Sequence, residues 1–160
     1  MQARMSNPAM SVPGAMNALA ALSKAASHSA LPEATIGLVT LRASQLNGCS
    51  VCVEMHTRGL KRAGETDERI FTVPAWRESP YFDDAERAAL ALSEAATRLA
   101  DRPDPVPDDV FDEAAKHFDE EALAALILQI ALINVWNRLN VVTRQVGGAW
   151  TRSVGEGPAS

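Results

Sequence analysis

The two cysteines of the chain, Cys49 and Cys52, have two residues between them, and His56 follows Cys52 by one helical turn. This Cys-x-x-Cys spacing lets the two sulfurs form a disulfide with little backbone movement. A separation of four residues places Cys52 and His56 on one face of a helix. A histidine there can take the proton of the Cys52 thiol, whose thiolate is the reactive form. The stretch therefore predicts a redox-active dithiol beside an acid/base.

The pattern around the cysteines adds a helix start to this chemistry. We expect a helix from near Cys49 to Ala63, because Asn47-Gly48 can end the preceding helix and Gly64 can end this one. The unpaired amides and the dipole of a helix N-terminus stabilise a thiolate. In this interpretation Cys52, nearer to His56, attacks an oxidised substrate and becomes a sulfenic acid. Cys49, exposed at the turn, resolves that acid by closing the disulfide.

Two other interpretations use the same residues. A zinc site needs a fourth ligand, but His28 and His117 are distant in sequence and form no second ligand pair. Two inert buried cysteines are the simpler alternative, although it explains neither the spacing nor the histidine. We expect no metal and no cofactor.

Size and composition indicate the class of protein. A chain of 160 residues, 47% hydrophobic and 22% charged, is one globular domain over 1–160 or a protomer completed by its neighbours. Abundant alanine and the lack of sustained alternating β-branched runs predict an all-α fold. A net charge of -5 without a basic cluster argues against nucleic acid as a partner. We expect no apolar run of the length needed to span a bilayer, and no secretory signal is recognisable, so we expect a cytoplasmic protein with no membrane contact.

Apolar spacing, caps and breakers predict the helices. Asp83, Asp108 and Asp119 are expected to cap the helices that follow them. The last helix is apolar on most of its circumference, which places it at the centre of a bundle or at a subunit interface. Residues 1–10 and 147–160 are expected to be loose arms, although Trp150 could dock. The expected helices cover residues 12–27, 32–46, 49–63, 65–71, 84–99, 109–117 and 120–145.

These residues resemble the alkylhydroperoxidase D family of the carboxymuconolactone decarboxylase-like superfamily, and specifically its peroxidase-related branch. The resemblance covers nearly the whole chain from the second expected helix onward, and Cys-x-x-Cys-x-x-x-His is its most specific part. The segments that carry it are residues 41–49, Cys52, 55–57, 63–65, 75–82, 86–90 and 134–138.

The resemblance implies an all-helical bundle that assembles into trimers or hexamers. It also implies a thiol peroxidase of antioxidant defence, in which the second cysteine attacks a hydroperoxide and the first resolves. The implied reductant is a dithiol, such as a lipoylated or thioredoxin-like protein. The lactone-decarboxylating branch works without the cysteine pair, so decarboxylase activity is disfavoured.

The chain departs from the family pattern near the histidine. The family's proton relay includes a glutamate twelve residues before the first cysteine, where this chain has Gly37. Such a carboxylate would orient the histidine and raise its basicity. Glu33, one helical turn earlier, and Glu94, in a later helix, are the candidate replacements. Some members also carry a histidine between the cysteines, where this chain has Val51. The alternative function is therefore a redox-responsive or structural oligomeric protein without peroxidase turnover.

Overall fold

The computed structural model describes residues 1–27, 31–101 and 103–148, and within these ranges the chain forms helices and no strand. The all-α prediction is confirmed, and so is the helical fold implied by the resemblance. The helices are α1 Pro8–Ser11, α2 Ala15–Ala26, α3 Glu33–Leu46, α4 Ser50–Arg62, α5 Asp67–Thr72, a short 3-10 helix Val73–Ala75, α6 Asp84–Thr97, α7 Asp108–His117 and α8 Glu120–Val142.

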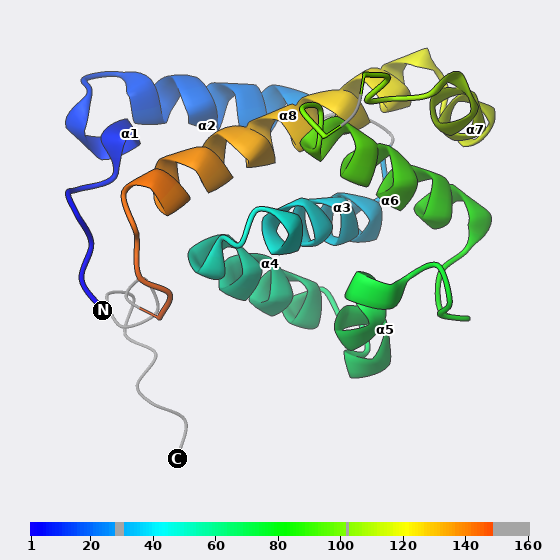
Figure 1. Ribbon diagram of the computed structural model, residues 1–160, viewed down its shortest axis with the longest axis horizontal. Helices are drawn as coiled ribbons and strands as arrows, with labels where there is room; N and C mark the ends of the chain where they lie inside the picture. The colour runs from blue at the N-terminus through cyan, green and yellow to red at the C-terminus, as the bar shows by residue number, and fades with distance from the viewer. Residues whose placement is uncertain (28–30, 102, 149–160) are drawn as a thin grey trace.

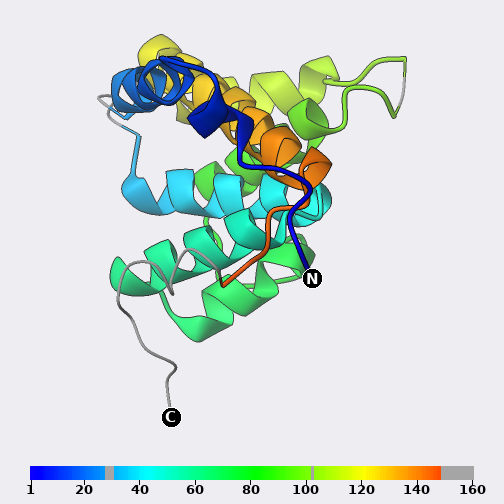
Figure 2. The ribbon, with the colours of Figure 1, turned by 90° about the vertical axis from the view of Figure 1, so that its left-hand side faces the viewer.

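The helices are stacked in layers around α3 (Figure 1). α3 packs against α4 on one side and against α6 and α8 on others, while α2 covers the outer side of α8. The turn at Asn47-Gly48 reverses the chain, so α4 runs back along α3 (Figure 2). The start of α4, which carries the cysteines, therefore lies beside the end of α3 and below α8.

Most helix ends agree with the sequence. Asp83 and Glu86 form a capping box at α6, and Asp119 accepts a hydrogen bond from Ala122 N at α8. Gly48 follows α3 with a φ of 65°, a left-handed conformation that glycine adopts without strain. The prediction for Asp108 is wrong: it is the first residue of α7, and the preceding proline holds the cap position without a side-chain bond.

α8 is the core helix, but it is not buried on all sides. Leu126 and Ile130 are buried, whereas Ile127, Leu128 and Val135 on the opposite side are about 40% exposed. α8 is also long and apolar enough to cross a membrane, contrary to the sequence expectation. Its most apolar stretch is 56% buried inside the protein, as a core helix would be.

The N-terminal residues 1–10, which the sequence suggested to be a loose arm, lie alongside the end of α8. Arg4 N donates to Thr143 O at 2.9 Å, and Gln145 Nε2 donates to Met5 O at 2.8 Å. These bonds hold the segment, which we call the N-terminal arm, against α8 (Figure 2). His28, Trp150 and the tail beyond Gly148 lie outside the described residues.

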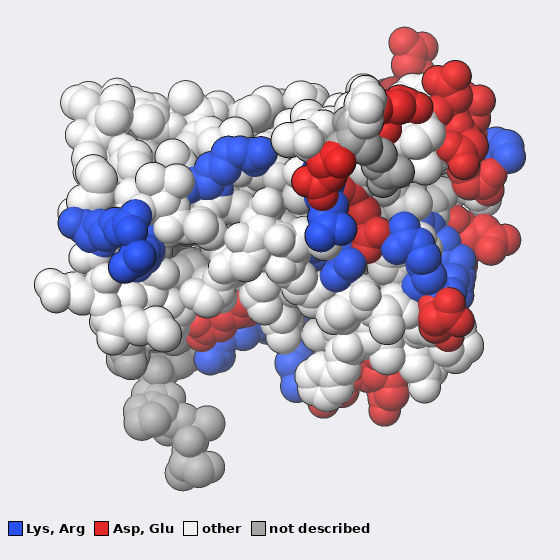
Figure 3. All heavy atoms as spheres, in the orientation of Figure 1, with Lys and Arg blue, Asp and Glu red and all other residues white. Residues whose placement is uncertain are grey.

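The face of the molecule in Figure 3 is divided by charge. Acidic and basic side chains are intermixed on the right, over α5, α6 and α7, while the part over α2 and α8 shows a few basic side chains among uncharged ones.

Candidate functional site

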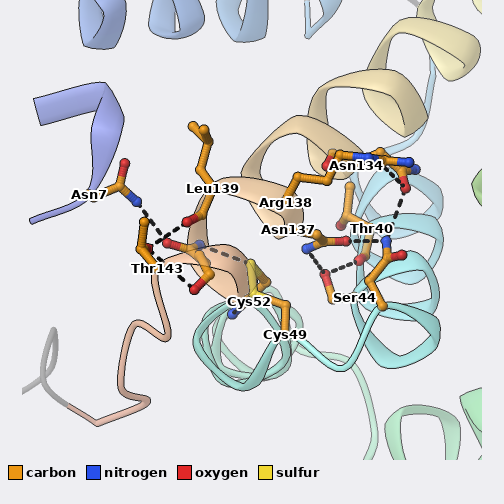
Figure 4. Close-up of a disulfide and its surroundings, with 12 residues drawn as sticks. Asn7, Thr40, Ser44, Cys49, Cys52, Asn134, Asn137, Arg138, Leu139 and Thr143 are labelled. Carbon is orange, nitrogen blue, oxygen red and sulfur yellow. Dashed lines mark hydrogen bonds between the residues drawn. A yellow bond between two sulfur atoms is a disulfide. The ribbon is translucent and has the colours of Figure 1, made fainter. Parts of the chain in front are cut away.

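Cys49 and Cys52 form a disulfide across the first turn of α4, with a Cα–Cα distance of 5.4 Å (Figure 4). Cys49 is the N-cap residue of the helix, which begins near Cys49 as the sequence predicted. Both cysteines are buried, with exposed fractions of 2% and 3%. The prediction of an exposed Cys49 is therefore wrong, because Cys49 packs with Ala43 and with Ile133 of α8 in a small apolar cluster.

Each sulfur accepts a hydrogen bond from a different part of the chain. The backbone N–H of Cys52 donates to Cys49 Sγ at 3.3 Å, as in a helix cap. The Nδ2 of Asn140, from α8, donates to Cys52 Sγ, also at 3.3 Å (Figure 4). Hydrogen bonds of this kind favour the charged form of an acidic group, so Asn140 would stabilise a Cys52 thiolate in the reduced protein.

The neighbouring hydrogen bonds determine which way the Asn140 amide lies. Asn7 Oδ1 accepts the backbone N–H of Ala9 at 2.9 Å, which leaves Asn7 Nδ2 to donate to Asn140 Oδ1 at 2.8 Å. With its oxygen so engaged, Asn140 presents its nitrogen to Cys52, as the donor–acceptor inventory of an amide requires. The N-terminal arm thus contributes to the orientation of the amide that contacts the Cys52 sulfur.

Two further asparagines, one and two helical turns before Asn140, hold α8 in place. Asn137, fully buried, donates to Ser44 Oγ at 3.1 Å and accepts from Asn47 Nδ2 at 2.8 Å. Asn134 donates to Thr97 Oγ1 at 3.0 Å. These bonds tie α8 to the end of α3 and to the turn before the cysteines (Figure 4).

His56 contacts α3 through a hydroxyl group. Its Nδ1 lies 3.1 Å from Thr40 Oγ1, and Thr40 Oγ1 lies 2.7 Å from the carbonyl oxygen of Ile36. The hydroxyl has one proton, which it donates to the carbonyl, so it accepts from an Nδ1–H of the imidazole. This leaves the Nε2 lone pair of His56 free to act as a base. Burial lowers the pKa of His56 from 6.5 to about 4, so the imidazole is neutral at neutral pH.

Glu94, one candidate for the relay carboxylate, is held elsewhere. Its carboxylate accepts hydrogen bonds at 2.6 to 3.0 Å from the side chains of Arg42, Trp76 and Arg77. Burial raises the pKa of Glu94, but these hydrogen bonds outweigh it and keep the pKa below its usual value. Among the described residues its hydrogen bonds go to this group and not to His56.

Glu33 is separated from His56 by the register of the two antiparallel helices. Thr40 lies opposite His56, and Gly37 lies opposite Leu60, one turn further along α4. Glu33 lies a further turn away, roughly 10 Å along the axis from Thr40, and it is exposed. A Cβ atom at Gly37 would lie 2.5 Å from Leu60 Cδ2. Leu60 therefore fills the space that a glutamate at position 37 would need.

An apolar cavity of about 570 Å³ opens beside the site. Cys52 and His56 are both part of its wall, and Cys49 is not. Apolar side chains form one part of its wall, with Val51, Met55, Leu132, Ile133 and Trp136 among them. Polar side chains, among them Thr40, Gln129 and Asn140, form the rest. A cavity of this size, with apolar walls and several polar groups, has the form of a binding site for a small molecule.

The structure gives no support to a zinc site at these residues. His117 lies on α7, where its Nε2 is 3.4 Å from Glu113 Oε1. Among the described residues no three Cys, His, Asp or Glu side chains are arranged to hold a metal ion.

Sequence reasoning missed Thr40 and Asn140. Thr40 looks like one more core residue of α3, because nothing local marks a partner sixteen residues away. Asn140 had a signal, since Asn134, Asn137 and Asn140 recur every third residue in an otherwise apolar helix. Buried amides must be hydrogen-bonded, so such a row indicates a buried polar contact.

The fold and the site define a helical protein with a disulfide at a helix N-terminus. The model of the carboxymuconolactone decarboxylase family matches residues 13–95. YdfG, an uncharacterised protein of Bacillus subtilis (strain 168), is 36% identical over 129 residues, which cover 81% of this chain and 86% of YdfG. The chain belongs to the carboxymuconolactone decarboxylase family.

Solved structures share the fold. A protein of unknown function from Agrobacterium tumefaciens, proposed to be the antioxidant defence protein AhpD, has a TM-score of 0.85 and 35% identity. The match covers 92% of this chain and 99% of that one. The debrominase Bmp8 has a TM-score of 0.77 at 24% identity, over 88% of this chain and 75% of its own, and shows likeness of fold alone. The resemblance to the alkylhydroperoxidase D family is confirmed.

The lowered pKa of His56 predicts a pH-dependent stability. Because the folded pKa of about 4 lies below the unfolded value of 6.5, the unfolded chain binds the proton first as the pH falls. The contribution of His56 to the free energy of unfolding is therefore complete above pH 6.5 and is lost as the pH falls toward 4. Between pH 7 and pH 5 the oxidised protein should lose about 2 kcal/mol of unfolding free energy from this group. Urea denaturation of wild type and His56→Gln measures it, and equal pH dependence in both would contradict it.

The hydrogen bond from Asn140 predicts the acidity of Cys52. Asn140→Ala should raise the pKa of the Cys52 thiol by about 1 unit, because hydrogen bonds to charged groups contribute about 1.5–3 kcal/mol. The pH dependence of alkylation by iodoacetamide in a Cys49→Ser background measures this pKa. Asn134→Ala, a buried amide of the same helix that does not contact sulfur, is the control. An equal shift in both variants would mean that α8 is merely displaced.

Proposed function

We propose that this protein is a thiol-dependent peroxidase that reduces organic hydroperoxides with electrons from a dithiol. The observation that carries the proposal is the Cys49–Cys52 disulfide at the start of α4, with Cys52 and His56 on the wall of one apolar cavity. Membership of the family and the likeness to the A. tumefaciens protein, itself proposed for antioxidant defence, support it.

In the first step Cys52 attacks the hydroperoxide. His56 Nε2 takes the proton of the Cys52 thiol, and the thiolate attacks the terminal oxygen of ROOH. A sulfur–oxygen bond forms, the O–O bond breaks, and the alkoxide leaves as ROH with the proton that His56 returns. Cys52 is then a sulfenic acid. Asn140 stabilises the thiolate before the attack by donating a hydrogen bond to it. This hydrogen bond takes over part of the role of the family glutamate, which would act on the thiolate through the histidine.

In the second step the thiol of Cys49 attacks the sulfur of Cys52. The disulfide forms and water leaves, which protects Cys52 from further oxidation. A dithiol, of the lipoyl or thioredoxin-like class, then gives two electrons and two protons to restore both thiols.

We also propose that the protein acts in the cytoplasm as a homo-oligomer. The apolar residues exposed on α8, Ile127, Leu128 and Val135, support such assembly.

The competing proposal is a redox-responsive protein without peroxidase turnover. The packing of Leu60 against Gly37 favours it, because this packing replaces the carboxylate by an apolar contact. Thr40 orients His56 but cannot stabilise an imidazolium as a carboxylate would.

Steady-state assays separate the two proposals. Wild-type protein should consume cumene hydroperoxide in the presence of dihydrolipoamide, and Cys52→Ser should lose this activity because it lacks the attacking sulfur. Cys49→Ser, assayed without dihydrolipoamide, should consume about one equivalent and stop at the sulfenic acid. Equal rates for wild type and Cys52→Ser would overturn the peroxidase proposal.

A paired substitution tests the missing carboxylate. Gly37→Glu alone should destabilise the protein, because its side chain meets Leu60. The pair Gly37→Glu with Leu60→Ala makes room and should raise the rate of Cys52 oxidation by about tenfold, the usual size of such an orienting effect. The pair Gly37→Gln with Leu60→Ala is the isosteric control, and thermal melting checks the fold. A gain shared by the glutamine variant would show that the carboxylate is not what limits turnover.

A further inference from the structure

A second cavity meets the other cysteine of the disulfide. It has a volume of about 430 Å³, and its wall includes Gly48, Cys49 and Ser50 at the start of α4. Val141 and Arg144, at the end of α8, form another part of the wall. The N-terminal arm contributes its first two residues.

The two cavities divide the disulfide between them. Cys52 and His56 border only the 570 Å³ cavity, and Cys49 borders only the 430 Å³ cavity. Asn140, which donates to Cys52 Sγ, borders both. Gln145 and Val146 also border both, so the two spaces adjoin, and each of them meets a different cysteine.

We propose that the two half-reactions use opposite sides of the disulfide: the hydroperoxide meets Cys52 in the larger cavity, and the reducing dithiol attacks Cys49 from the smaller one. This inference rests on the proposed function for the identity of the oxidant. The reductive half concerns the disulfide itself and can be tested alone.

The direction of thiol–disulfide exchange agrees with this division. A thiolate attacks a disulfide sulfur along the S–S axis, from the side opposite the leaving sulfur. Attack on Cys49 Sγ thus comes from the side away from Cys52. The bond between the reductant sulfur and Cys49 forms, and the Cys49–Cys52 bond breaks. Cys52 leaves as a thiolate that accepts the Asn140 N–H, and a stabilised thiolate is the faster leaving group.

The second thiol of the reductant completes the exchange. It attacks the reductant sulfur of the mixed disulfide and releases Cys49 as a thiolate. The reductant leaves as a disulfide, and its two protons pass to Cys49 and Cys52. Arg144, exposed and charged, borders this cavity, where it attracts the incoming thiolate.

A matched pair of tryptophan variants tests the inference. Val141 and Met55 are each 43% exposed, and each borders only one cavity, the smaller and the larger respectively. Reduction by dihydrolipoamide is followed from protein oxidised with diamide, and oxidation by cumene hydroperoxide is followed from reduced protein, both by thiol titration. Val141→Trp should slow reduction by about tenfold or more, because it obstructs the aligned approach to Cys49, and should leave oxidation near wild type. Met55→Trp should do the reverse.

Two controls make the outcome decisive. Leu99→Trp, at a site 57% exposed and outside both cavities, reports the effect of tryptophan alone. Gln2→Trp repeats the obstruction of the smaller cavity from the N-terminal arm, so it still decides the matter if Val141→Trp does not fold. Reduction slowed by Met55→Trp and unaffected by Val141→Trp and Gln2→Trp would overturn two-sided access. Failure of wild type to react with the hydroperoxide would overturn the peroxidase instead, while the diamide-oxidised protein still reports the reductive side.

Discussion

The buried asparagines of α8 must all find hydrogen-bond partners inside the protein, and the geometry of the site depends on this constraint. An unsatisfied buried amide costs roughly 1–3 kcal/mol, so the helix cannot slide or rotate freely in its apolar surroundings. Asn134 and Asn137 fix α8 against α6, α3 and the turn before α4. One turn later, the same register brings Asn140 to Cys52. The asparagines of an otherwise apolar helix thus place a hydrogen-bond donor on the sulfur of Cys52.

The histidine is supported by a different device from the one that its family leads one to expect. Thr40 accepts the Nδ1–H of His56 and donates its own hydroxyl in a hydrogen bond to a helical carbonyl, so the imidazole is oriented without a charge. Burial then keeps it neutral. Position 37 has no side chain, and Leu60 occupies the space that one would need. The groups that contact the two sulfurs are instead Asn140 and the start of α4.

Much of the fold and the core of the site follow from local sequence. The caps Asp83 and Asp119 and the glycine after α3 act over a few residues, so the helices they bound could be placed without knowledge of the fold. The first two turns of α4 and its cap contain Cys49, Cys52 and His56, so their proximity is likewise a property of the helix alone. The predicted cap of α7 was wrong by one residue, because Pro107 and not Asp108 holds the cap position. The local sequence does not decide between two adjacent residues.

The chemistry of the disulfide was determined by the cysteine spacing itself, because three residues along a helix start are enough to bring two sulfurs together. The partners of those sulfurs were decided only by the tertiary structure. Asn140 lies 88 residues from Cys52 in the chain, Asn7 lies 133 residues from Asn140, and Thr40 meets His56 only because α3 and α4 pack side by side. Packing between helices, which no local pattern encodes, also decides three further features. It buries Cys49, it keeps Glu33 and Glu94 away from the histidine, and it forms the two cavities.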